Sequence, residues 1–186
     1  LLPFLAMCLM LCSLSECRED INPFEETNSG RRTIACYLNG EPYSQKLTYR
    51  MEAKYDVFEN GYYFAVSATL YSDELRDENG NVMEAELMIW LSDQGTLEAG
   101  KKYQFGKYES RPEGMPAYYA LLGYDNLCSA GWIEIRNITV LDTGDAIISG
   151  NFEFEGTYHE TDEEFHVTGG TFDMVAPYVT HDWPLE

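Results

Sequence analysis

Apolar and polar side chains alternate with a period of two along most of the chain from residue 33 onward. This period is typical of β-strands with one buried face, because successive side chains of a strand point to opposite sides. The clearest case places Leu47, Tyr49, Met51, Ala53, Tyr55 and Val57 on one face, opposite Thr48, Arg50, Glu52, Lys54 and Asp56. The pattern therefore predicts a sheet-based domain with one wet side.

Turn residues divide the alternating segments into about nine strands, and no segment has helical periodicity. Strands are expected near 47–57, 62–70, 82–91, 97–105 and 117–124, with polar loops at 73–81 and 106–116, and a meander from residue 131 to the end. The apolar parity switches at Arg136-Asn137 and at Gly169-Gly170, which indicates β-bulges there. We expect an antiparallel β-sandwich, because strands such as 82–91 are apolar on both sides; the alternative is a β-barrel.

The first 14 residues are apolar and uncharged, which predicts a secretory signal. A membrane span would need about 20 such residues. The run ends at Leu14-Ser15-Glu16-Cys17, which resembles a bacterial lipobox, in which the cysteine is lipidated and becomes the first residue. We therefore expect a signal peptide at 1–16, a flexible tether at 17–32 and a single all-β domain at 33–186. The alternative is an ordinary cleaved signal that releases a soluble secreted protein.

Three further segments carry a resemblance to a family. The acidic residues after Cys17 resemble the surface-export signal of Bacteroidetes lipoproteins. Residues 35–42 (ACYLNGEP), 148–154 (ISGNFEF) and 167–173 (VTGGTFD) resemble the opening and closing strands of small Bacteroidetes lipoproteins classed as a domain of unknown function. The resemblance spans roughly residues 33–175 and implies an all-β lipoprotein on the outer membrane, facing the cell exterior. It implies no activity and no catalytic residues.

Charge and cysteine content narrow the classes further. The formal net charge of −20 repels nucleic acid, which excludes a nucleic-acid-binding role. Cys8 and Cys12 fall in the signal, so Cys36 and Cys128 are left in the domain. These two form a disulfide in an oxidising envelope or remain two buried thiols, and the sequence leaves both alternatives open.

The sequence contains no motif that predicts catalysis or a cofactor. His159, His166 and His181 have no metal-ligand spacing. The loop at 77–81 begins like an EF-hand, but its glycine comes two residues early and Met88 stands where the ligating Glu belongs. An EF-hand is thus excluded, while a looser calcium site in the acidic loops stays open and unassigned. A glycosidase would need a specific pair of carboxylates, and with 32 acids the sequence cannot select one.

Aromatic residues give the best candidates for ligand binding. Tyr119 follows Tyr118, and adjacent strand residues face opposite sides, so one of the two leaves the core. Trp132 shares a side with charged residues, as does Trp90, so each is a candidate platform for stacking a sugar; the alternative is a Trp packed under a loop or a second sheet.

The leading hypothesis is a non-catalytic surface lipoprotein that binds a glycan or a protein. The alternatives are an envelope structural or assembly protein and, third, a glycoside hydrolase.

Overall fold

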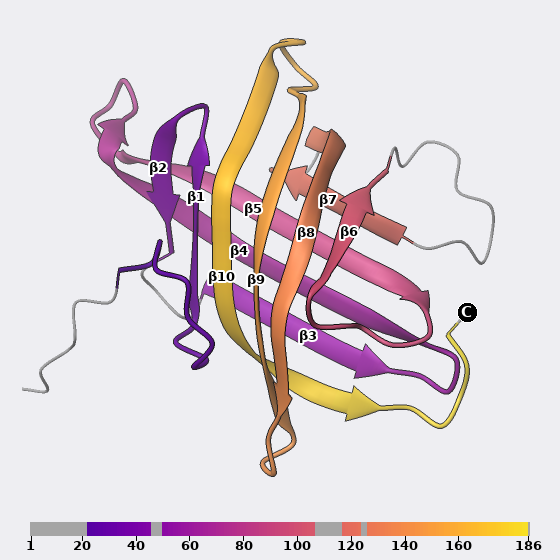
Figure 1. Ribbon diagram of the computed structural model, residues 1–186. Helices are drawn as coiled ribbons and strands as arrows, with labels where there is room; N and C mark the ends of the chain where they lie inside the picture. Colours follow the sequence, from indigo (N-terminus) through magenta and orange to yellow (C-terminus); the bar gives the residue numbers. More distant parts are fainter. Residues whose placement is uncertain (1–21, 46–49, 107–116, 124–125, 186) are drawn as a thin grey trace, which may run out of the picture.

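The computed structural model describes residues 22–45, 50–106, 117–123 and 126–185, which form ten β-strands (Figure 1). The strands are β1 (Thr33–Leu38), β2 (Glu41–Ser44), β3 (Met51–Val57), β4 (Gly61–Arg76), β5 (Val82–Gln94), β6 (Lys101–Phe105), β7 (Ala117–Leu122), β8 (Asn126–Val140), β9 (Asp145–Thr157) and β10 (Glu164–Thr180). No α-helix occurs among these residues. The all-β prediction is confirmed, with ten described strands where about nine were expected.

The strands form one sheet that is folded over into two crossed layers, which is a sandwich-like arrangement. In Figure 1, β8, β9 and β10 stand in front, and β3, β4 and β5 cross behind them on a diagonal. The long strand β10 joins the layers: most of it pairs with β9, and its last residues, Tyr178 to Thr180, pair with β3. That last pairing is parallel, whereas the other pairings among the described strands are antiparallel, so the expected antiparallel sandwich-like fold is a mixed sheet at this corner.

The core lies between the two layers and is rich in aromatic rings. Phe64 of the rear layer packs against Phe172 of the front layer, with ring centroids 6.0 Å apart. Phe172 also contacts Phe152, at 6.4 Å. Gly150 makes room for this ring, because a Cβ there would lie 2.7 Å from the Phe172 ring and 2.2 Å from the Glu134 carbonyl oxygen.

Both bulges predicted from parity switches are confirmed. The β8–β9 register shifts between Ile135 and Asn137, and the β9–β10 register shifts between Val167 and Gly170. Each shift keeps apolar side chains on the core side before and after the bulge, which is why the switch was visible in the sequence.

The polar loop expected at 73–81 is shorter than predicted. Strand β4 continues to Arg76, which pairs with Val82 beyond an irregularity that starts at Tyr71. The turn itself is closed by Gly80, whose N–H donates to the Asp77 carbonyl at 2.9 Å. Polar composition misled the prediction because this hairpin end projects into water, where a strand needs no apolar face.

Residues 22–31, here called the strap, are bound to the domain, so the prediction of a flexible tether is wrong for this part. The Asp173 carboxylate, in the outer face of β10 and 1% exposed, accepts the backbone N–H groups of Ser29, Gly30 and Arg31 at 3.0, 2.9 and 3.3 Å. It also accepts the Thr27 hydroxyl. Gly30 has φ +71° and lies so close to β9 and β10 that a Cβ would meet Val175 at 2.8 Å.

Cys36 and Cys128 are both buried free thiols, so the structure has the second of the two alternatives. Burial raises the pKa of Cys36 to about 12. The predicted signal peptide, Cys17, residues 46–49 and most of the 106–116 loop lie outside the described residues. In the part of the chain that is described, no helix is long and apolar enough to cross a bilayer.

Candidate ligand-binding groove

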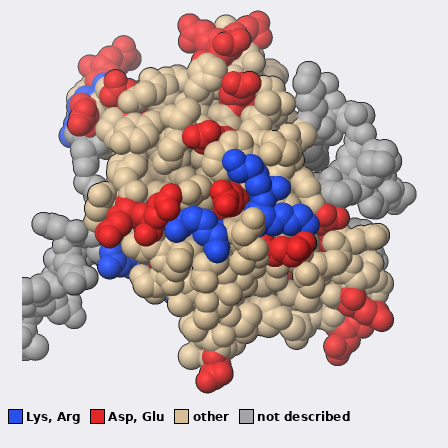
Figure 2. All heavy atoms as spheres, in the orientation of Figure 1, with Lys and Arg blue, Asp and Glu red and all other residues tan. Residues whose placement is uncertain are grey.

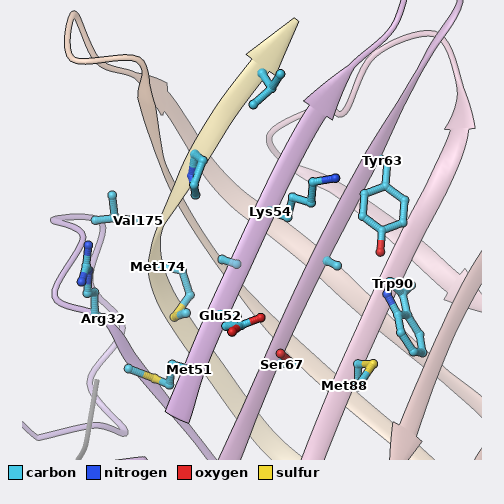
Figure 3. Close-up of a pocket in the computed structure, with 14 residues that line it drawn as sticks. Arg32, Met51, Glu52, Lys54, Tyr63, Ser67, Met88, Trp90, Met174 and Val175 are labelled. Atoms are coloured by element: carbon cyan, nitrogen blue, oxygen red, sulfur yellow. The ribbon is translucent and has the colours of Figure 1, made fainter. Parts of the chain in front are cut away.

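A groove opens on the outer face of the rear layer, over β3, β4, β5 and the end of β10 (Figure 3). Its volume is about 640 Å³. It is lined by Arg32, Met51, Glu52, Ala53, Lys54, Tyr63, Ala65, Ser67, Met88, Trp90, Met174, Val175, Pro177 and Val179. Most of these side chains are apolar, which departs from the usual polar outer face of an antiparallel sheet.

The groove exists because the middle strand, β4, carries small side chains on its outer face. Ala65 and Ser67 form the floor, opposite the core residues Phe64 and Val66. Longer side chains flank them in register: Lys54 and Trp90 beside Ala65, Glu52 and Met88 beside Ser67. Since neighbouring strands lie about 4.8 Å apart, short residues on one strand between long residues on its two neighbours leave a trough along it.

Trp90 forms one wall of the groove and is backed by a second aromatic ring outside the lining. Trp90 of β5 lies opposite Tyr119 of β7, and their ring centroids are 4.6 Å apart with a tilt of 44°. Tyr63 lies on the same outer face of β4, so it adds a third ring near the trough. Two of the three aromatic residues selected from the sequence, Trp90 and Tyr119, are thus brought together.

The charged residues of the groove largely compensate one another. The Lys54 ammonium lies 2.6 Å from the Asp56 carboxylate, whose side chain is only 5% exposed. The hydrogen bond to Asp56 raises the pKa of Lys54, which favours the charged form of the lysine. Among the described residues, Arg32 and Glu52 have no ion-pair partner, and they carry opposite charges on the groove lining.

The far side of the Lys54–Asp56 pair is closed by the C-terminal segment. His181 Nε2 lies 3.8 Å from Asp56 Oδ1. The imidazole stacks on Phe58, with ring centroids 4.7 Å apart, and contacts Trp183 at 4.6 Å. These contacts explain why Asp56 is buried although it belongs to the outer face of β3.

Trp132 lies elsewhere, on the outer face of the front layer. Figure 2 shows this face, where Lys and Arg side chains gather across the middle among Asp and Glu. The Lys102 ammonium lies 3.4 Å from the centroid of the Trp132 ring, so this face of the indole already has a cation on it. A shallower hollow of about 290 Å³ adjoins Trp132. The structure therefore does not join Trp132 to the Trp90 wall.

In the turn at 77–81, which resembles the start of a calcium loop, the Asp77 carboxylate accepts hydrogen bonds from the turn itself. Asp77 Oδ1 accepts the N–H groups of Asn79 and Asn81, and Oδ2 accepts the Asn81 amide. The hydrogen bonds from Asn81 lower the pKa of Asp77, and the bond from the Asn81 side-chain amide has the largest effect. Within the described ranges, no three His, Cys, Asp or Glu side chains are grouped as metal ligands.

Comparison with known proteins adds no relative. No protein-family model, curated protein or solved structure matches the chain.

Sequence reasoning missed the groove floor and its charged residues. The signal was present: the outer face of the strand around residues 62–70 reads Tyr63, Ala65, Ser67, which is small and nearly uncharged where a wet face is usually charged. Glu52 was placed on an outward face correctly, but only strand order shows that Met88 lies on the other side of the same floor residue.

Proposed function

We propose that the protein is a non-catalytic binding protein, held at the bacterial cell surface by a lipid on Cys17, and that its ligand occupies the outer groove. The supporting observation is the groove itself: an apolar, aromatic-walled trough on a sheet face that would otherwise be solvated. Exposed apolar surface with a polar rim usually marks an interaction site. The volume of about 640 Å³ also lies in the range of ligand sites, about 300–1,000 Å³.

The carboxylates near the groove support binding rather than hydrolysis. Glycoside hydrolysis uses two carboxyl groups that face each other across the bond to be cleaved. Glu52 is the only acid in the described lining, and the nearby Asp56 carboxylate is bound to Lys54. Among the described residues, the groove lining thus holds a single carboxyl group; Glu86 lies outside it, in an adjoining hollow that also contains Glu52.

A blocking variant tests whether the groove is the binding site. Ala65→Arg places a long side chain on the floor without touching the core, and Thr139→Arg adds the same charge to an exposed position of β8 as the matched control. The purified chain is screened against glycans and peptides by calorimetry. We expect at least one ligand to bind wild type and Thr139→Arg alike and Ala65→Arg much more weakly. Unchanged binding to Ala65→Arg for every ligand, or no ligand in either class, would contradict the proposal.

The anchor is tested separately. In a bacterial host, radioactive palmitate should label the wild-type chain and not Cys17→Ser, because the thioether at Cys17 carries the acyl chains. Labelling of Cys17→Ser would remove the lipoprotein part of the proposal. Digestion of intact cells with an external protease then reports whether the domain faces outward.

A further inference from the structure

The electrostatics of the groove select against charged ligands. The whole chain carries a formal net charge of −20, so an anion is repelled on approach. A cation that enters the trough finds one unpaired acid on the described lining, Glu52, together with the opposite charge of Arg32. Since Lys54 is neutralised by Asp56, and Arg32 and Glu52 cancel, the groove is close to neutral in a strongly acidic molecule. An uncharged ligand fits this balance best.

The polar groups of the lining require a ligand that both donates and accepts hydrogen bonds. The Arg32 guanidinium has only donors, and the Glu52 carboxylate has only acceptors. A purely apolar ligand, such as an alkyl chain, would strip water from both groups and give them nothing in return, which costs about 1–3 kcal/mol for each group left unpaired. Hydroxyl groups donate to a carboxylate and accept from a guanidinium, so a polyhydroxylated ligand satisfies both.

The apolar part of the lining suits the C–H face of a sugar ring. The indole of Trp90 and the phenol of Tyr63 border the trough, with Met88 beside them. An aromatic ring has a negative face, which attracts the weakly positive hydrogens of C–H groups. The groove lining extends across four neighbouring strands, from β10 to β5, which is a width of about 14 Å and more than one pyranose ring occupies.

The backbone beneath the groove argues against a peptide. Extended peptides commonly bind by adding a strand to an open sheet edge. Strand β4 pairs with both β3 and β5, and β3 pairs with β10 as well, so the main-chain groups under the groove already have partners. A peptide here would find side chains only, while its own amide groups would lose water.

We propose that the groove binds an uncharged oligosaccharide, with a sugar C–H face on Trp90 and with hydroxyl groups bonded to Arg32 and Glu52; Tyr63 borders the trough, but the Lys54 ammonium already lies 5.5 Å from its ring centroid. This inference rests on the proposed function and names its ligand class. Stacking supplies most of the affinity, and the two charged side chains fix the orientation of the sugar chain in the trough.

The test is a glycan array of neutral, acidic and amino oligosaccharides, probed with the full-length chain and followed by calorimetry on the strongest neutral sugar. Trp90→Ala should weaken binding about tenfold, the loss typical of removing a ring on which a ligand stacks. Trp90→Phe, which keeps a ring, should restore most of the affinity, and Trp132→Ala on the other layer should change nothing. Added salt should change the affinity little, because an uncharged sugar forms no ion pair with the protein.

Four outcomes overturn the inference: no neutral oligosaccharide binds; acidic or basic sugars bind better, with strong salt dependence; Trp90→Ala leaves affinity unchanged; or Trp132→Ala weakens it as much. The failure of this inference is distinguishable from failure of the proposed function. A peptide that binds wild type and not Ala65→Arg would refute the oligosaccharide and keep the groove as the binding site. Sugar binding that is indifferent to Ala65→Arg would refute both.

Discussion

Asp173→Asn tests the hydrogen bonds by which the Asp173 carboxylate holds the strap against the sheet, here called the clasp. Oδ2 of Asp173 accepts from Ser29 N, Arg31 N and the Thr27 hydroxyl, while Oδ1 accepts from Gly30 N. In an asparagine, the better orientation keeps the amide oxygen at the Oδ2 position and turns the NH₂ group against the Gly30 N–H. One charge-assisted bond is then lost, and three become neutral bonds of about half the strength. At about 1.5 kcal/mol for the first and about 0.5 kcal/mol for each of the others, the loss is about 3 kcal/mol.

Urea unfolding, followed by tryptophan fluorescence, measures this loss as a lower midpoint with an unchanged slope. Trypsin provides a local readout, because Arg31, the last residue of the strap, and Arg32, which follows it, are both exposed. We expect Asp173→Asn to be cut there faster than wild type. Asp142→Asn, which removes the same charge from an exposed turn, is the control for net charge. An Asp173→Asn variant with the wild-type midpoint and cleavage rate would refute the clasp.

Three further predictions concern stability. Burial raises the pKa of the Cys36 thiol from 9.0 in the unfolded chain to about 12 in the folded one. The contribution of the protonated thiol to the free energy of unfolding is therefore complete below pH 9 and falls by about 1.4 kcal/mol per pH unit above it. Cys36→Val should flatten this alkaline fall in the free energy of unfolding, and an equal slope in the two proteins would contradict the burial argument. Gly150→Ala should lower the free energy of unfolding by about 2 kcal/mol or more, because the added Cβ would collide with the Phe172 ring. Gly106→Ala is the control: a Cβ there has no atom within 4 Å, so the melting temperature should change little. Equal effects of the two substitutions would be inconsistent with the packing described. Phe152→Ala, at a fully buried position, should lower the free energy of unfolding by about 4 kcal/mol in urea titrations, and a loss near zero would mean that the core is not packed around it.

The sequence predicted what depends on local alternation and missed what depends on strand order. Bulges at Arg136-Asn137 and Gly169-Gly170 were visible because a parity switch is a local signal, and the structure has both. The parallel pairing of β10 with β3 joins residues more than 120 positions apart, and no local pattern encodes it.

The candidate site divides in the same way. Trp90 and Tyr119 were selected because strand geometry forces them outward, and they do lie on one outer face. Trp132 met the same criterion and lies on the other layer, because period two gives the side of a strand and not its neighbours. The Lys54–Asp56 pair could not be recognised from the sequence either, because two charged residues on a solvent-facing strand are ordinary. Only the packing of His181 and its neighbours buries the Asp56 side chain.

The clasped strap has a geometric consequence for a chain anchored at Cys17. Only residues 18–21 then separate the acyl-bearing residue from Asn22, where the described fold begins. Five peptide steps reach at most about 17 Å when fully extended. With this anchor, the domain would lie close to the lipid headgroups, and the short connection would restrict its rotation. A long polymer would then have to approach the domain from the side that faces away from the membrane.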